Sequence, residues 1–200
     1  MERVYIFKRF ERFWHWSQAL LIIGMMITGF EIHGAYKLFG YAKAGQIHTT
    51  AAWALMILWA FAIFWHFTTG EWRQYVPTTD KLGAMIRYYL SGIFGHAPHP
   101  FKQTQLRKHN PLQRLAYLFA QLLINPLIWA SGLAYLFYNE LNAAGWPVSL
   151  PVIGVVHTVA AFLMLTFFIV HVYFATTGHT WTSHIKAMVT GWEEVEGDKA

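Results

Sequence analysis

The sequence predicts an all-α integral membrane protein: a four-helix transmembrane bundle with both termini in the cytoplasm, formed by a single domain over residues 1–200. Hydrophobic residues make up 56% of the chain and charged residues 12%, whereas soluble domains carry roughly 25% charged residues. Four apolar segments are long enough to cross a bilayer, and basic residues gather in alternate connections. The predicted spans cover about 14–30, 47–67, 112–138 and 153–177.

The uneven distribution of Lys and Arg predicts the orientation. The N-terminal segment, the 68–111 connection taken together with Arg114, and the tail carry four, seven and two of them, whereas the two opposite connections hold only Lys37 and Lys43. Because cytoplasmic loops are rich in Lys and Arg, we expect a multi-pass protein of the bacterial inner membrane. This pattern is explained by topology and contact with membrane lipid, so nucleic acid is not an expected partner.

Three shorter features complete the predicted fold. Residues 80–94 have apolar side chains at helical spacing, which predicts an amphipathic helix on the membrane surface. Asn125-Pro126 lies inside the third span and predicts a kink. The tail is expected to form a short interfacial helix and an acidic end.

The chain lacks cysteine and holds 11 histidines. The absence of cysteine excludes disulfides, thiolate metal sites, iron–sulfur clusters and covalently attached c-type haem. A cofactor held by side chains would therefore be held by imidazole.

Two histidines, His157 and His171, lie inside the fourth apolar span. Ionisable groups at membrane depth are costly and usually functional. Their spacing of 14 residues puts them within roughly 40° on one helix face and about 21 Å apart along the axis. One helix therefore offers an imidazole near each side of the membrane.

The predicted topology gives each level three candidate histidines. The outer level has His33, His48 and His157, and the inner level has His15, His66 and His171. His33 and His66 lie at span ends, where interfacial solvation explains them, and His66 is also a candidate for a quinone site.

The same spacing recurs with small residues in the first two spans. Gly29 follows His15 by 14 residues, and Ala62 follows His48 by 14 residues. Each of these helices thus offers a histidine at one level and a small residue on the same face at the other level. The small residue leaves room there for a flat macrocycle. This favours two six-coordinate haems that can only pass electrons, with iron ligands paired as His15 with His171 at the inner level and His48 with His157 at the outer level.

Basic residues beside the inner level are candidates for contacts with haem propionates. These are Arg9, Arg12, Arg73, Lys108 and Arg114, of which Arg9, Arg12 and Arg114 are the first candidates. Contact with anionic lipid head groups explains them equally well.

Several segments resemble the prokaryotic di-haem cytochrome b subunits, a family that includes the formate dehydrogenase gamma subunit, the thiosulfate reductase cytochrome b subunit and the nickel hydrogenase b subunit. They are RFWHWSQALLIIGMMITGF, AGQIHTTAA, HNPLQRLAY, the H-x13-H of the fourth span and the tail TTGHTWTSHIKAMVTGWEE. The resemblance covers nearly the whole chain. It implies a four-helix bundle with two haem b groups on the same histidine pairs.

The resemblance also implies a quinone site on the cytoplasmic side, beside the inner haem. The family's Asn before the third span matches Asn110, and Gln113 lies close to it in sequence. His109 stands where the family usually has an aromatic residue, so this chain departs from the pattern there.

The expected function is a membrane-anchoring electron-transfer subunit of a respiratory oxidoreductase. Electrons would pass between menaquinone or ubiquinone and a periplasmic partner subunit, an iron–sulfur or multihaem protein that carries the terminal chemistry. Residues 31–46 and 139–152 are the expected docking surface. The alternatives are a free-standing cytochrome b561 of the superoxide/quinone oxidoreductase type and a His-lined metal transporter. The absence of Asp and Glu from the predicted spans argues against the transporter.

Overall fold

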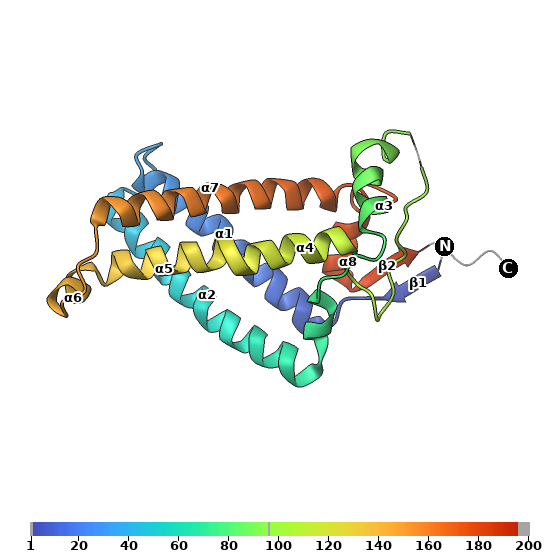
Figure 1. The fold of residues 1–200 in the computed structure, drawn as a ribbon, viewed down its shortest axis with the longest axis horizontal. Helices are drawn as coiled ribbons and strands as arrows, with labels where there is room; N and C mark the ends of the chain where they lie inside the picture. Colours follow the sequence, from blue (N-terminus) through green and yellow to red (C-terminus); the bar gives the residue numbers. More distant parts are fainter. Residues whose placement is uncertain (1, 96, 196–200) are drawn as a thin grey trace. The chain divides into compact units, whose positions relative to one another are not determined.

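The computed structural model describes residues 2–95 and 97–195, and most of these residues are helical (Figure 1). The elements in chain order are β1 (Glu2–Tyr5), α1 (Arg9–Ile32), α2 (Tyr41–Thr69), the 3-10 turn η1 (Glu71–Tyr75), α3 (Leu82–Arg87), the π-helical turn η2 (Tyr88–Gly92), α4 (Pro111–Phe119), the π-helical turn η3 (Ala120–Ile124), α5 (Asn125–Leu136), α6 (Tyr138–Ala143), α7 (Leu150–Ala175), α8 (Ser183–Thr190) and β2 (Trp192–Val195).

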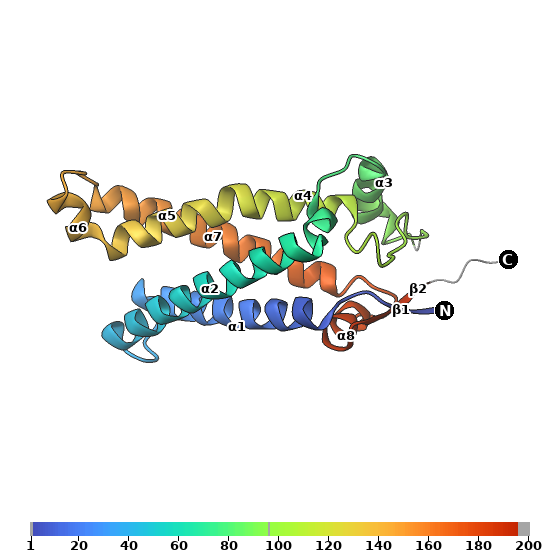
Figure 2. The same cartoon turned by 90° about the horizontal axis from the view of Figure 1, so that it is seen from below.

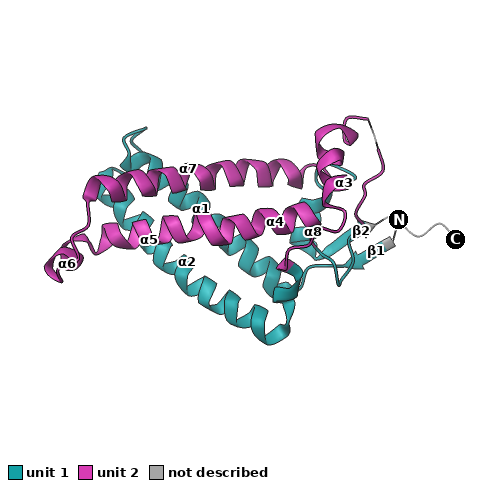
Figure 3. Cartoon of the chain, viewed as in Figure 1, with its two compact units in different colours: residues 1–74, 103–108, 179–200 teal, residues 75–102, 109–178 magenta. Residues whose placement is uncertain are grey.

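The chain divides into two compact units (Figure 3). Unit 1 comprises residues 1–74, 103–108 and 179–200, and unit 2 comprises residues 75–102 and 109–178. Each unit is built on one pair of long helices: α1 packs on α2 in unit 1, and α5 packs on α7 in unit 2.

Within the described residues, three helices are long and apolar enough to cross a membrane: α2, the continuous helix Pro111–Leu136, and α7. Helix α1 has 24 residues but begins with the charged Arg9, Glu11 and Arg12, so it is less apolar than the others, and a fourth crossing stays a prediction. Large apolar side chains lie exposed on these helices, such as Phe64 (69%) and Phe162 (54%). Such surfaces suit helices whose solvent is lipid.

The turn between α1 and α2 is shorter than the predicted connection 31–46, because α2 already begins at Tyr41. Glu31, only 5% exposed, holds this turn. Its Oε1 accepts the backbone N–H groups of Leu38, Phe39 and Gly40, each at 2.7 Å. A single carboxylate thus satisfies three donors that the turn would otherwise leave unpaired.

The two ends of the described chain meet in a small antiparallel sheet within unit 1, which the all-helical prediction missed. Strand β1 pairs with β2, with Tyr5 opposite Trp192. Gly191 precedes β2 at φ +90°, and a Cβ there would lie 2.5 Å from Tyr5 Cε2. Only glycine can therefore turn the chain between α8 and β2 at this place.

Side chains from the start of α1 cap the end of α8, also within unit 1. Arg12 Nη1 donates to the carbonyl of Val189 at 2.5 Å, and Trp16 Nε1 donates to that of Met188 at 3.1 Å. They satisfy carbonyls that the end of a helix leaves unpaired. The short helix of the tail agrees with the prediction, whereas its predicted acidic end beyond residue 195 lies outside the described residues.

In unit 2 the long helix Pro111–Leu136 contains one π-helical turn, η3, directly before Asn125-Pro126. Proline has no N–H to donate, and its ring clashes with the carbonyl four residues earlier, so the wider turn accommodates it. The kink predicted at this place stays a prediction. The amphipathic helix predicted for 80–94 agrees with α3 and η2, whereas α6 was not predicted.

Candidate functional site: two anchored imidazoles

His48 lies near the start of α2 in unit 1, beside the C-terminal part of α1. Its Nδ1 is 3.1 Å from Thr28 Oγ1. Thr28 is 1% exposed, and its hydroxyl donates to the carbonyl of Gly24 at 2.8 Å. The antiparallel pairing of α1 and α2 brings these groups together across 20 residues of sequence (Figure 2).

This geometry assigns the tautomer of His48. A hydroxyl has one proton, and Thr28 directs it to a backbone carbonyl. Oγ1 must therefore accept from the ring, so the proton of the imidazole is on Nδ1 and the lone pair is on Nε2. A neutral imidazole in this form is ready to bind a metal ion through Nε2.

His157 on α7 in unit 2 has the same surroundings. Its Nδ1 is 3.0 Å from Ser131 Oγ, and that hydroxyl donates to the carbonyl of Leu127 at 2.6 Å. Ser131 is 5% exposed. The same reasoning places the proton of His157 on Nδ1. Two separate helix pairs thus present an imidazole of the same tautomer.

A glycine follows each of these hydroxyl residues. A Cβ added at Gly29 would lie 3.4 Å from Cε1 of His48, and one at Gly132 would lie 3.3 Å from Cε1 of His157. Both distances are at the edge of van der Waals contact, so the missing side chain lets the imidazole approach the neighbouring helix closely. The further role predicted for Gly29, packing against a haem, stays a prediction.

The other end of the α1–α2 pair holds a buried histidine among aromatic rings. His66 Nδ1 donates to the carbonyl of Ala62 at 2.6 Å, because a carbonyl oxygen can only accept. The His66 ring lies edge-on to Trp14 and Trp65, with centroids 5.1 and 5.0 Å away. Ala62 is 4% exposed, and its part in haem packing stays a prediction.

The two histidines predicted as inner ligands lie beside aromatic rings in their own helices. His15 meets Trp16 edge-on at 5.1 Å between centroids, and His171 stacks on Phe167 at 6.1 Å. Neither contact assigns a tautomer, because neither involves a ring nitrogen with a polar partner. Their role as ligands stays a prediction.

Three of the residues predicted for the quinone site, His109, Asn110 and Gln113, lie at the start of α4 in unit 2. The fourth, His66, lies near the end of α2 in unit 1, so its part in the site stays a prediction. Asn110 is the N-cap: its Oδ1 accepts from Gln113 N at 2.8 Å, and Gln113 Oε1 accepts from Asn110 N at 2.9 Å. This capping box gives both residues a structural role that the sequence reading missed.

Rings surround that cap. The Asn110 amide donates to the hydroxyl of Tyr89 at 3.4 Å, and burial raises the pKa of Tyr89 above its ordinary value of 10.0, so the hydroxyl stays protonated. His109 lies 5.1 Å from the ring centroids of both Tyr75 and Tyr117. His109 therefore takes part in an aromatic cluster.

Two of the residues predicted to contact propionates, Arg12 and Arg114, have hydrogen-bond partners within their own units. Arg12 caps α8, as described above. Arg114 donates through Nε to the carbonyl of His109 at 3.0 Å and through Nη1 to that of Val76 at 3.2 Å. Arg9 is exposed. Contact with a propionate stays a prediction for all three.

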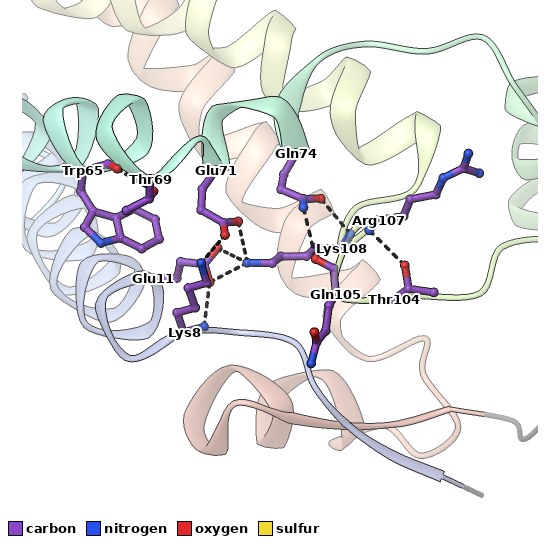
Figure 4. Close-up of polar contacts among 10 residues, drawn as sticks. All are labelled: Lys8, Glu11, Trp65, Thr69, Glu71, Gln74, Thr104, Gln105, Arg107 and Lys108. Carbon is purple, nitrogen blue, oxygen red and sulfur yellow. Dashed lines mark hydrogen bonds and ion pairs between the residues drawn. The ribbon is translucent and has the colours of Figure 1, made fainter.

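A buried ion cluster in unit 1 was not predicted (Figure 4). Lys108 Nζ donates to Glu11 Oε1 at 2.7 Å, Glu11 Oε2 at 2.8 Å and Glu71 Oε2 at 2.9 Å. Lys108 is 2% exposed and Glu11 4%. Burial alone would raise the pKa of Glu71, but Lys8 and Lys108 hold it below its ordinary value of 4.5. The cluster fastens residues 103–108 to α1 and η1.

The sequence model of the prokaryotic cytochrome b561 family matches residues 6–191. The chain belongs to this family. It is therefore a membrane b-type cytochrome that transfers electrons, with haem b as its cofactor. The comparison with solved structures gave no significant match.

Three curated relatives illustrate the range of the family. The chain is 28% identical to cytochrome YdhU of Escherichia coli (strain K12) over 96% of its own length and 75% of that protein. It is 24% identical to a Ni/Fe-hydrogenase B-type cytochrome subunit of Rhizobium leguminosarum bv. viciae, over 95% and 88%. It is 26% identical to the protein-methionine-sulfoxide reductase subunit YedZ1 of Azospira oryzae, over 53% and 57%.

The residues present fit haem b. In the neutral form, His48 and His157 would each carry the lone pair on Nε2, the atom through which an imidazole would bind a haem iron. Within residues 2–95 and 97–195, no three His, Cys, Asp or Glu side chains form a group that could hold a bare metal ion. When bound, haem b accepts and releases one electron at a time.

The sequence reading missed Thr28, Ser131 and Gly132. A signal was present: the dipeptides Thr28-Gly29 and Ser131-Gly132 each combine a hydroxyl with a glycine, and each stands on the apolar segment that precedes a histidine-bearing one. The role of these dipeptides depends on which helix packs against them, and the dipeptides alone do not predict that.

Proposed function

We propose that the chain holds two haem b groups in a four-span bundle and carries electrons between the quinone pool and a periplasmic partner subunit. His15 with His171 would hold the inner haem, and His48 with His157 the outer one. The observation that best supports this is the matched tautomer of His48 and His157, each assigned by a buried hydroxyl.

Haem counting tests the ligand assignment. The purified protein should contain about two b haems per chain in a reduced-minus-oxidised spectrum. His157→Ala and His48→Ala should each remove the outer haem, and His171→Ala and His15→Ala the inner one. The matched control is His33→Ala, an exposed histidine next to α1, which should keep both haems. A haem-free protein, or two haems retained in both His48→Ala and His157→Ala, would refute the assignment.

The quinone site is proposed at the start of α4, on the cytoplasmic side. Asn110 belongs to it by family resemblance, with its neighbour Gln113 and with His109 and His66 as further candidates. The aromatic surroundings support it, because the Tyr89 ring lies beside the polar amide of Asn110 and the Tyr75 ring lies beside His109.

Two substitutions separate a quinone contact from the helix cap. Asn110→Ser keeps a side-chain oxygen able to cap α4 but removes the amide, whereas Asn110→Ala removes both. We expect Asn110→Ser to raise the KM for quinol while its melting temperature stays close to that of the wild type. An unchanged KM in Asn110→Ser would show that Asn110 is only a cap.

The partner is proposed to be an oxidoreductase subunit, because two of the relatives are named as subunits of a hydrogenase and of a sulfoxide reductase. An iron–sulfur or multihaem protein is the type of partner proposed. The predicted docking segments support this through exposed apolar side chains: Leu38 is 63% exposed and Trp146 71%. The fixing of residues 38–40 by Glu31 would present Leu38 in one conformation.

Copurification tests the docking surface and also tests the alternative of a free-standing cytochrome b561. Trp146→Ser and Leu38→Ser should reduce the amount of a redox subunit that copurifies from native membranes. Leu106→Ser, on the predicted cytoplasmic side and 84% exposed, is the matched control and should not. Absence of any copurifying redox subunit from the wild type would favour the free-standing cytochrome.

A further inference from the structure

The structure gives the two imidazoles proposed as outer ligands the same polar anchor on a neighbouring helix. Thr28 Oγ1 lies 3.1 Å from His48 Nδ1, and Ser131 Oγ lies 3.0 Å from His157 Nδ1. Thr28 belongs to α1 and Ser131 to α5, so the anchor arises separately in two helix pairs.

Both hydroxyls have the same directionality. Each donates its own proton to the carbonyl four residues earlier in its helix, Thr28 to Gly24 and Ser131 to Leu127. Each oxygen is therefore oriented as an acceptor toward the histidine. A residue that only filled space, such as Val or Ala, would pack equally well in an apolar bundle without costing a buried hydroxyl group.

We propose that Thr28 and Ser131 are positioning residues for the outer haem: they accept the Nδ1–H of His48 and His157, fix each ring so that Nε2 faces the iron, and lower the reduction potential of that haem. This inference rests on the proposed function. A hydrogen bond accepted from Nδ1–H makes the imidazole a more basic ligand, and a more basic ligand favours the ferric form over the ferrous form.

The two glycines strengthen the argument. Gly29 and Gly132 follow the hydroxyl residues directly, and a Cβ at either would reach 3.3–3.4 Å from the Cε1 atom of the histidine. The hydroxyl fixes one ring nitrogen while the glycine lets the ring lie close to the helix backbone. Together they restrict both the rotation and the distance of the imidazole.

The test is a redox titration of Thr28→Val and Thr28→Ser in the full-length haem-loaded protein. Valine has nearly the shape of threonine but no hydroxyl, so the midpoint potential of the outer haem should rise while that of the inner haem stays unchanged. Serine restores the hydroxyl and should return the potential to the wild-type value. The outer haem is identified as the one lost in His157→Ala.

Ser131→Ala and Ser131→Thr form the second pair of variants. Ser131→Ala should raise the midpoint potential of the outer haem, and Ser131→Thr, which keeps the hydroxyl, should leave it at the wild-type value. Two matched controls remove hydroxyls that bond a carbonyl four residues earlier but are exposed. Thr166→Val removes the bond to Phe162, and Ser91→Ala removes the bond to Arg87. Neither control should move a potential. Haem retention during dialysis should weaken on the order of 10-fold in Thr28→Val.

The outcomes separate the two proposals. A wild-type protein without haem, or outer haem retained in His48→Ala and His157→Ala, defeats the proposed function. If those variants lose the haem as expected but Thr28→Val and Ser131→Ala leave the potential unchanged, only the positioning role fails. If Thr28→Val binds no haem, Thr28→Ser decides: restored haem supports the role of the hydroxyl, and continued loss assigns Thr28 to packing alone.

Discussion

Unit 1 and unit 2 hold their histidines in the same way but stabilise their polar ends by different means. In unit 1 the buried Lys108 is paired with the carboxylates of Glu11 and Glu71. In unit 2 the start of α4 is stabilised by the neutral capping box of Asn110 and Gln113. The first arrangement depends on charge and the second does not.

The comparison shows that the two units can have the same hydroxyl–histidine contact although their helix ends are stabilised differently. The hydroxyl–histidine contact needs only two packed helices with a hydroxyl at the right level. The ends of those helices are free to use whatever satisfies their backbone groups. The stability of unit 1 should therefore respond to pH and to the loss of charge, and that of unit 2 chiefly to the loss of hydrogen bonds and ring contacts.

The largest expected effect is on the ion cluster. Lys108→Met leaves Glu11 and part of Glu71 as buried carboxylates without their cation, which should cost about 3–5 kcal/mol of unfolding free energy. Unfolding in mixed detergent and SDS, followed by circular dichroism, measures it. The control Lys186→Met removes an exposed lysine of the same unit. Combining Lys108→Met with Glu11→Gln should recover part of the loss, and no recovery would show that the charge is not the cause.

Gly191→Ala should have the next largest effect, because it strains the backbone at φ +90° and also pushes a Cβ into Tyr5 and Phe7. We expect a loss of roughly 2–4 kcal/mol in the same unfolding assay. Gly34→Ala is the matched control: its φ is +81° but its surroundings are open. Equal losses in the two variants would mean that the pairing of β1 with β2 adds little to unit 1.

Asn110→Ala tests the neutral end of unit 2. Loss of an N-cap side chain should cost about 1 kcal/mol, less than the loss of the buried cation in unit 1. Thermal unfolding of Asn110→Ala and the wild type at two salt concentrations measures this loss of stability. The loss should be the same at both concentrations, because the cap is uncharged. A strongly salt-dependent cost would put charge into the stability of unit 2 as well.

The smallest expected effect is the pH dependence that Glu71 contributes. Its pKa in the folded protein lies below the ordinary value of 4.5, so its contribution is fully present above that value and is lost as the pH falls through the folded pKa. The stability difference between the wild type and Glu71→Gln should be constant from pH 7 to 5 and shrink below 4.5. If the stability difference grew as the pH fell, the pKa of Glu71 in the folded protein would lie above its ordinary value, and the lowered pKa would be refuted.

Much of the fold could be predicted from the sequence. Long apolar runs identify α2, the 111–136 helix and α7, because helices in lipid must be apolar and about 20 residues long. The family could be recognised because several segments resemble it, among them the H-x13-H of the fourth span and the HNPLQRLAY entry to the third. The helix boundaries at Tyr41 and Leu150 were less predictable, because both helices begin before the apolar spans that were predicted from hydropathy.

The sequence by itself determined the membrane class and the candidate ligands, since these depend on composition and on periodicity along one helix. The family followed from the resemblance of several segments to known proteins. Only the tertiary structure decided which hydroxyl faces which imidazole, which lysine is buried among carboxylates, and that the two ends of the described chain pair as strands. Thr28 and His48 are 20 residues apart, and Lys108 and Glu11 are 97 apart. Contacts at such separations arise from the packing of helices and loops against one another, which no local pattern of residues specifies.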